Sequence, residues 1–164
     1  PAAPSGDNAA FLAAAGDDGA VRLWDLADLT AEPTILDGGG GSLLAVTFSP
    51  DGQLLAAAGD SGIISLWTVT NPSANPTNLS GHEGRAFAVA FSPDGQTLAS
   101  AGFDQTVRLW RVVNTTAEIA TLSGHAASVW SVAFSPDGIL LATADRSVLL
   151  TGSAAAFLEN WRMA

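Results

Sequence analysis

The pentapeptide FSPDG occurs three times in this chain, at residues 48–52, 91–95 and 134–138, and each copy starts 43 residues after the last. Other landmarks keep the same step: Leu-Trp ends at Trp24, Trp67 and Trp110, and Gly-His occurs at 81–82 and 124–125. A fixed period of this length indicates one supersecondary unit copied in tandem, each copy packing on its neighbours. We therefore expect a repeat protein, an architecture more typical of a binding surface than of a catalyst.

The most regular copy, residues 81–113, predicts four strands. Alternating large and small apolar residues over 86–91 place Phe87, Val89 and Phe91 on one face of the first strand. The Ser-Pro-Asp-Gly segment that follows is a turn, because proline presets φ, aspartate caps the turn and glycine takes a positive φ. The other strands are predicted over 97–101, 106–112 and 117–122. Together the four form an antiparallel meander.

Prolines and composition shifts indicate how the copies are arranged along the chain. Pro33 and Pro76 precede the fourth strand of the first two copies, and proline belongs on an edge strand because it has no N–H for the ladder. The fourth strand is thus the outer edge of each unit. We divide the chain into an N-terminal extension (1–6), a repeat segment (7–151) and a C-terminal tail (152–164) in which a short helix is expected. The repeats span about 7–37, 38–80, 81–123 and 124–151.

Composition excludes several classes of protein. The chain has 164 residues, of which 48% are hydrophobic, and a formal net charge of −10. The hydrophobic content is too high for a disordered tail, and the negative charge disfavours nucleic acid or an anionic membrane as partner. Absence of cysteine excludes disulfides and thiolate metal sites. The histidines and aspartates fall in repeat turns and no catalytic motif is found, so we expect no cofactor, no metal and no catalysis; the compartment leans to cytoplasmic.

The pattern GH…VAFSPDG..LAS.G.D..VRLW resembles the WD-repeat β-propeller family in its bacterial form, over residues 10–151. The resemblance implies an all-β fold of about four four-stranded blades. It also implies a structural tetrad of hydrogen-bonded side chains inside a blade. The copy from residue 81 matches all four positions, and the last copy matches three, with Thr151 at the tryptophan position. The tetrad residues are His82, Ser100, Asp104 and Trp110, and then His125, Thr143 and Asp145.

The resemblance also places two sets of equivalent residues at one face of the ring, around its central opening. One set lies early in the inner strand and the other in the turn between the second and third strands. In the family such residues contact protein partners, and bulky aromatics at variable positions are typical anchors. The alternative, that Phe87 and Trp130 only fill space between blades, stays open. The two sets are Leu44, Phe87 and Trp130, and Asp17, Asp60 and Phe103.

The number of repeats raises the question of closure, because about 3.8 repeats fit the chain and propellers have 4–8 blades. Further blades on a longer polypeptide, a second copy of the chain, or another protein would each complete the ring; we favour the first. The expected function is a non-catalytic protein-interaction scaffold, for a partner with apolar anchors and a basic rim. The alternatives are a regulatory segment attached to a signalling NTPase or kinase, and a structural subunit of a large assembly.

Overall fold

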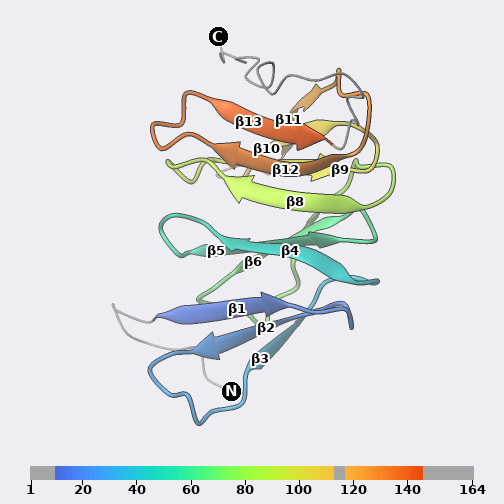
Figure 1. Cartoon of the computed structure of the whole chain (residues 1–164). Helices are drawn as coiled ribbons and strands as arrows, with labels where there is room; N and C mark the ends of the chain where they lie inside the picture. Colours follow the sequence, from blue (N-terminus) through green and yellow to red (C-terminus); the bar gives the residue numbers. More distant parts are fainter. Residues whose placement is uncertain (1–9, 113–116, 146–164) are drawn as a thin grey trace, which may run out of the picture.

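The computed structural model describes residues 10–112 and 117–145. Within those ranges the chain forms thirteen β-strands and no helix. The strands make four antiparallel sheets stacked in chain order, with the first and last sheets at opposite ends of the stack (Figure 1). The all-β expectation is therefore confirmed, and we call the sheets blades 1 to 4. The described residues contain no helix of the length and hydrophobicity needed to span a membrane.

The blades differ in how many strands they contain. Blade 1 consists of β1 (Phe11–Ala15), β2 (Ala20–Asp25) and β3 (Thr34–Asp37). Blade 2 consists of β4 (Leu43–Phe48), β5 (Leu54–Gly59), β6 (Ile64–Thr68) and β7 (Thr77–Leu79). Blade 3 consists of β8 (Ala86–Phe91), β9 (Thr97–Gly102), β10 (Val107–Arg111) and β11 (Ala117–Leu122). The described part of blade 4 is β12 (Val129–Phe134) and β13 (Leu141–Asp145).

Blades 2 and 3 are the expected meanders, in which each strand pairs with the next one along the chain. Strands β3 and β7 begin directly after Pro33 and Pro76 and lie at sheet edges, where a missing N–H costs no ladder hydrogen bond. Among the described residues, blade 1 lacks an inner strand, because its first strand, β1, corresponds to the second strand of the other blades. The extension at 1–6, the end of the fourth repeat at 146–151 and the tail helix expected at 152–164 lie outside the described residues.

The FSPDG segments form the same turn in blades 2, 3 and 4. In blade 2 the Ser49 hydroxyl donates to Asp51 at 2.5 Å and accepts the Leu54 amide at 2.9 Å, while Asp51 accepts the Gln53 amide at 3.0 Å. Gly52 has φ of 71°, which side-chain-bearing residues rarely adopt. Equivalent hydrogen bonds recur around Ser92 and Ser135. The constant pentapeptide spacing therefore reflects one hairpin, built three times.

One expectation about the inner strands is wrong. The pairing register shifts within the first strand of blades 2, 3 and 4, between residues 43 and 45, 86 and 88, and 129 and 131. Such a β-bulge redirects the residue it contains. Val89 and Phe91 share a face and pack towards blade 2, whereas Phe87 stacks on Trp130 of blade 4. Strict alternation fails there because the bulge adds one residue to the strand.

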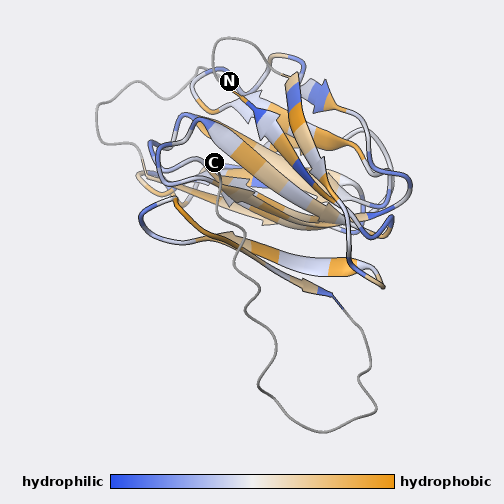
Figure 2. Ribbon diagram, turned by 90° about the horizontal axis from the view of Figure 1, so that it is seen from above, coloured by the Kyte–Doolittle hydropathy of each residue, from blue (hydrophilic) through white to orange (hydrophobic). Residues whose placement is uncertain are grey.

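Apolar residues are buried between blades rather than within them. Three core clusters lie at the three junctions of neighbouring blades, and the loops that join the strands are the more hydrophilic parts (Figure 2). At the junction of blades 2 and 3, Ala56, Ala58 and Ile64 are fully buried against Leu98 and Trp110. A single sheet of this size buries apolar surface only by stacking on another, so the junctions hold the fold together.

Candidate functional site

Four side chains of blade 3 form a continuous chain of hydrogen bonds. His82, in the loop before β8, contacts both carboxylate oxygens of Asp104 through Nδ1, at 3.0 and 3.1 Å. Its Nε2 lies 2.7 Å from the hydroxyl of Ser100 on β9, and that hydroxyl accepts the Trp110 indole N–H from β10 at 2.8 Å. The structure thus brings all four predicted tetrad residues together, and they link the entry loop to two strands and the turn between them.

The chemistry of the four groups specifies where the protons lie. An indole N–H only donates and an ionised carboxylate only accepts. With Trp110 donating to Ser100, the serine proton is left to point at His82 Nε2, and His82 donates through Nδ1 to Asp104. A neutral imidazole satisfies every contact, whereas a protonated ring would leave the Ser100 proton without this acceptor. The hydrogen bonds of the tetrad therefore favour the neutral form of the His82 imidazole.

Burial has the same effect as the hydrogen bonds. Removal from water lowers the pKa of His82 below its ordinary value, although the neighbouring Asp104 charge opposes the shift. Burial alone would raise the pKa of Asp104, but hydrogen bonds from the Glu83 amide, Thr106 and His82 together bring it below the ordinary value. At neutral pH the pair is thus a neutral imidazole donating to a carboxylate, which suits a structural link better than a proton-transfer pair.

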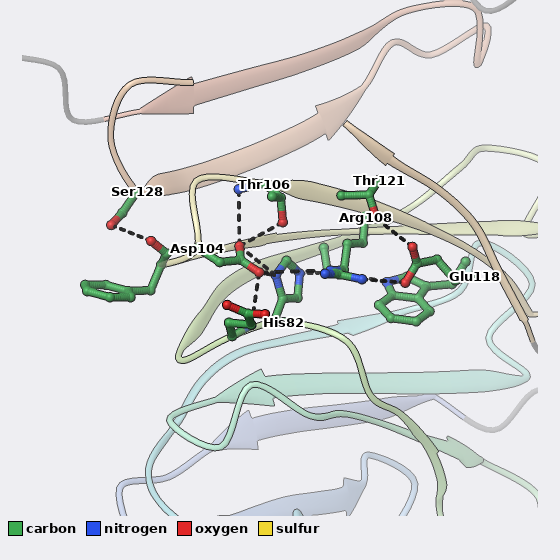
Figure 3. A network of polar contacts seen from close by, with 11 residues as sticks. His82, Asp104, Thr106, Arg108, Glu118, Thr121 and Ser128 are labelled. Atoms are coloured by element: carbon green, nitrogen blue, oxygen red, sulfur yellow. Dashed lines mark hydrogen bonds and ion pairs between the residues drawn. The ribbon is translucent and has the colours of Figure 1, made fainter. Parts of the chain in front are cut away.

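A second polar network lies beside the tetrad (Figure 3). Asp104 also accepts the Thr106 hydroxyl at 2.8 Å and the Glu83 amide at 3.0 Å. Arg108 lies between Asp104, 4.0 Å away, and Glu118 of the edge strand β11, with which it pairs at 2.6 Å. The Arg108–Glu118 pair therefore connects β10 to the outer edge of the blade, and Asp104 is held by His82, Thr106 and the Glu83 amide.

The tetrad is partial or missing in the other blades. In blade 4, His125 contacts Asp145 at 2.9 Å through Nδ1 and Thr143 at 2.8 Å through Nε2, and the expected fourth position, Thr151, lies outside the described residues. In blade 1, Ala14 occupies the serine position. The Asp18 carboxylate accepts two hydrogen bonds from Arg22. That pairing lowers the pKa of the exposed Asp18 carboxyl.

Blade 2 replaces the tetrad with a smaller set of polar contacts. Gly39 and Ala57 stand where the histidine and serine would be. The Ser65 hydroxyl instead lies 3.1 Å from the Asn78 side-chain oxygen and 3.3 Å from the Gly38 carbonyl. Blade 3 is therefore the blade most tightly connected by side-chain hydrogen bonds in the described part of the chain.

The first set of predicted partner-binding residues lies at the three β-bulges. Leu44, Phe87 and Trp130 occupy the same place in β4, β8 and β12. Leu44 is 44% exposed and Trp130 is 46% exposed, so neither is a buried core residue. The rings of Phe87 and Trp130 stack with centroids 4.0 Å apart and 13° between their planes. The two rings therefore bridge blades 3 and 4, and Trp130 is nearly half exposed.

The second set lies in the neighbouring turns. Asp17, Asp60 and Phe103 begin the turn after the second strand, and Phe103 is 59% exposed. Each contacts the loop of the next blade: Ser42 donates to the Asp17 carbonyl at 3.3 Å and Ser128 to the Phe103 carbonyl at 3.2 Å. Because the bulges pair next to these turns, both sets lie at the same end of the blades.

One contact at this end of the blades was missed by the sequence reasoning. Arg85 is the repeat equivalent of Ser42 and Ser128, and its Nε lies 3.0 Å from Asp60 across the junction of blades 2 and 3. The 43-residue step was the signal that would have found it. The aspartates at the FSPDG turns lie at the other end of the blades, and the described residues contain no group of three histidine, aspartate or glutamate side chains suited to a metal ion.

Comparison with known proteins agrees with this architecture. The family model described as "WD domain, G-beta repeat" matches four segments of the chain, residues 3–25, 32–68, 74–111 and 116–153. A comparison with curated proteins gave no match. The four matches cover most of the chain and recur in step with the four blades. The chain therefore belongs to the WD40 repeat family of β-propeller proteins, whose domains in general act as scaffolds for protein–protein interaction.

Proposed function

We propose that the end of the blades that holds the β-bulges binds a protein partner, and that the Phe87–Trp130 stack is its anchor. The observation that carries the proposal is this stack of two aromatic rings, 4.0 Å apart, of which Trp130 is nearly half exposed. Large aromatic side chains that are held rigidly and stay accessible are the residues that most often contribute strongly to binding. Leu44 and Phe103 extend the apolar surface at the same end.

The charges around the stack indicate the chemistry of the partner. Asp17 and Glu83 are exposed at this end of the blades, and Asp60 is part exposed beside Arg85. The chain as a whole carries a formal charge of −10. Complementary charge speeds association and excludes partners of the wrong sign. The preferred partner is therefore a segment with an aromatic or aliphatic side chain flanked by arginine or lysine.

A peptide selection tests the proposal without a known partner. Peptides selected from a random display library on the chain are expected to carry an apolar residue between basic ones. Trp130→Ala should weaken their binding about 30-fold, which corresponds to about 2 kcal/mol. The variant should lose about 0.5–1.5 kcal/mol of folding stability from the aromatic pair, and a further contribution from the buried part of the indole, but it should remain folded.

Ile139→Ala is the matched control, because Ile139 is an exposed apolar residue of the same blade at the opposite end, in the turn between β12 and β13. It should leave peptide binding unchanged. Equal losses with the two variants would show that the binding surface lies elsewhere. Selection of acidic peptides would contradict the charge argument.

A further inference from the structure

The two faces of blades 1, 2 and 3 differ chemically in the same way, and the second strand of blade 4 keeps the division, with Ala142 and Ala144 on one face and Leu141 on the other. One face, here the alanine face, carries two alanines of the second strand and a branched residue of the third; in blade 2 these are Ala56, Ala58 and Ile64. The other, the tryptophan face, carries a leucine of the second strand and the Leu-Trp tryptophan. In blade 3 these are Leu98 and Trp110.

Every junction joins the alanine face of one blade to the tryptophan face of the next. Ala56 and Ala58 of blade 2 belong to one cluster with Leu98 and Trp110 of blade 3. Ala13 and Ala15 of blade 1 pack with Leu55 and Trp67 of blade 2, and Ala99 and Ala101 of blade 3 with Leu141 of blade 4. The chain thus uses one type of interface three times, always in the same direction.

The two ends of the stack expose the two halves of that interface. Among the described residues, blade 1 has no blade against its tryptophan face, where Leu12 is 54% exposed although its equivalents Leu55 and Leu98 are fully buried. Leu26 is exposed too, and its equivalents Val69 and Val112 are buried. On blade 4 the alanine-face residues Ala142 and Ala144 are exposed, whereas Ala99 and Ala101 are buried. The two uncovered faces lie at opposite ends of the stack (Figure 1).

One further residue marks the uncovered face of blade 1 as a contact surface. Ile35 of β3 pairs with Arg22 and lies on the same face as Leu12 and Trp24. The equivalent residues in blades 2 and 3 are Asn78 and Thr121, which are exposed and make side-chain hydrogen bonds inside their own blades. Blade 1, whose tryptophan face is uncovered, thus carries an apolar residue at this position, whereas blades 2 and 3 carry polar ones. An exposed apolar patch of this kind marks a surface that contacts a partner.

We propose that a second copy of this chain covers both faces, head to tail, so that the tryptophan face of blade 1 packs on the alanine face of blade 4 of the partner copy. Any second copy carries both halves of an interface that the chain already forms three times. A two-fold arrangement forms the junction twice, once at each end, and covers both faces of both copies. The resulting ring has eight blades, within the range of closed propellers.

A charge-complementation experiment on the 164-residue chain tests this proposal. Sedimentation equilibrium at micromolar concentration should give twice the 16.6 kDa mass of one chain. Leu12→Glu and Ala142→Arg each bury an unpaired charge at both junctions, and each should raise the dissociation constant of the dimer about 100-fold or more. Leu29→Glu, at a highly exposed position in the loop before β3, should leave the dimer intact.

Mixing the two charged variants decides the orientation. In a head-to-tail pair of one Leu12→Glu chain and one Ala142→Arg chain, one junction brings the two introduced charges, of opposite sign, together and the other junction is native. The mixture should therefore form dimers that neither variant forms alone. Circular dichroism checks that each variant is folded, and Leu26→Glu replaces Leu12→Glu if it is not. A monomeric wild-type chain, a dimer insensitive to either variant, or no recovery on mixing would overturn the proposal; a monomer would point to further blades or another protein.

Discussion

Replacing Asp104 by alanine tests whether the tetrad of blade 3 holds that blade together. The Asp104 carboxylate accepts hydrogen bonds from His82 Nδ1, from the Glu83 amide and from Thr106. The His82 side chain is completely buried, so water cannot replace the lost acceptor. A buried donor left without a partner costs about 1–3 kcal/mol. We therefore expect Asp104→Ala to lower the free energy of unfolding by about 1–3 kcal/mol.

Asp60→Ala is the control, because it also removes a turn carboxylate, one position earlier in the sister repeat. Asp60 pairs with Arg85 at 3.0 Å, but the arginine side chain is more than half exposed. Exposed ion pairs of this kind contribute little, so the loss should be about 0.5 kcal/mol or less. Urea unfolding of the two variants, followed by circular dichroism, measures the difference. Equal losses at the two positions would refute the structural role of the tetrad.

The pH dependence of the same variant provides an independent check. The pKa of His82 is lowered by burial, so the unfolded chain binds a proton that the folded chain does not, and stability falls as the pH drops below about 6.5. The Asp104 charge opposes that shift in the native protein. Without it the pKa of His82 falls further, so the deficit of Asp104→Ala should grow as the pH is lowered from 7 through the folded pKa of His82, which lies below its ordinary value of about 6.5. A deficit that stays constant over this interval would show that His82 and Asp104 are not coupled.

The repeat period predicts most of the fold, because each copy tests the others. The FSPDG turns and the apolar alternation before them place two strands in each of blades 2, 3 and 4. The prolines locate the edge strands, since a residue without an N–H is tolerated only there. The tetrad residues of blade 3 come together as the resemblance implies, because loop, strand and turn have constant lengths within the repeat.

The bulges could not be predicted from the local sequence. The segment from Ala86 to Phe91 alternates without interruption, so alternation alone puts Phe87 beside Val89. The bulge arises from pairing with β9, where Ala86 is opposite Gly102 and Ala88 opposite Ala101. The Phe87–Trp130 stack depends on this bulge and on the packing of two blades, and both are long-range properties. What the sequence does show is that the position carries leucine, phenylalanine and tryptophan in the three repeats, so the repeat does not require one particular side chain there.

Two further predictions concern glycine and acid stability. A Cβ on Gly102 would lie 2.5 Å from His82 Nδ1, so Gly102→Ala should cost about 1–3 kcal/mol in urea melts, whereas a Cβ on Gly52 meets open space and Gly52→Ala should cost about 1 kcal/mol, from its positive φ alone. The acid prediction concerns Asp51, Asp94 and Asp137, whose pKa values are lowered first by a serine hydroxyl and then by a backbone amide. A carboxyl with a lowered pKa stabilises the fold above its unfolded value near 3.8, and that stability is lost as the pH falls through the folded value. Ser92→Ala removes the main cause at Asp94, so the drop in unfolding free energy between pH 5 and pH 3 should shrink. Thr70→Ala, at an exposed residue outside these turns, should leave the drop unchanged. An equal drop in Ser92→Ala and the wild type would show that the hydroxyl does not set the charge state of the turn.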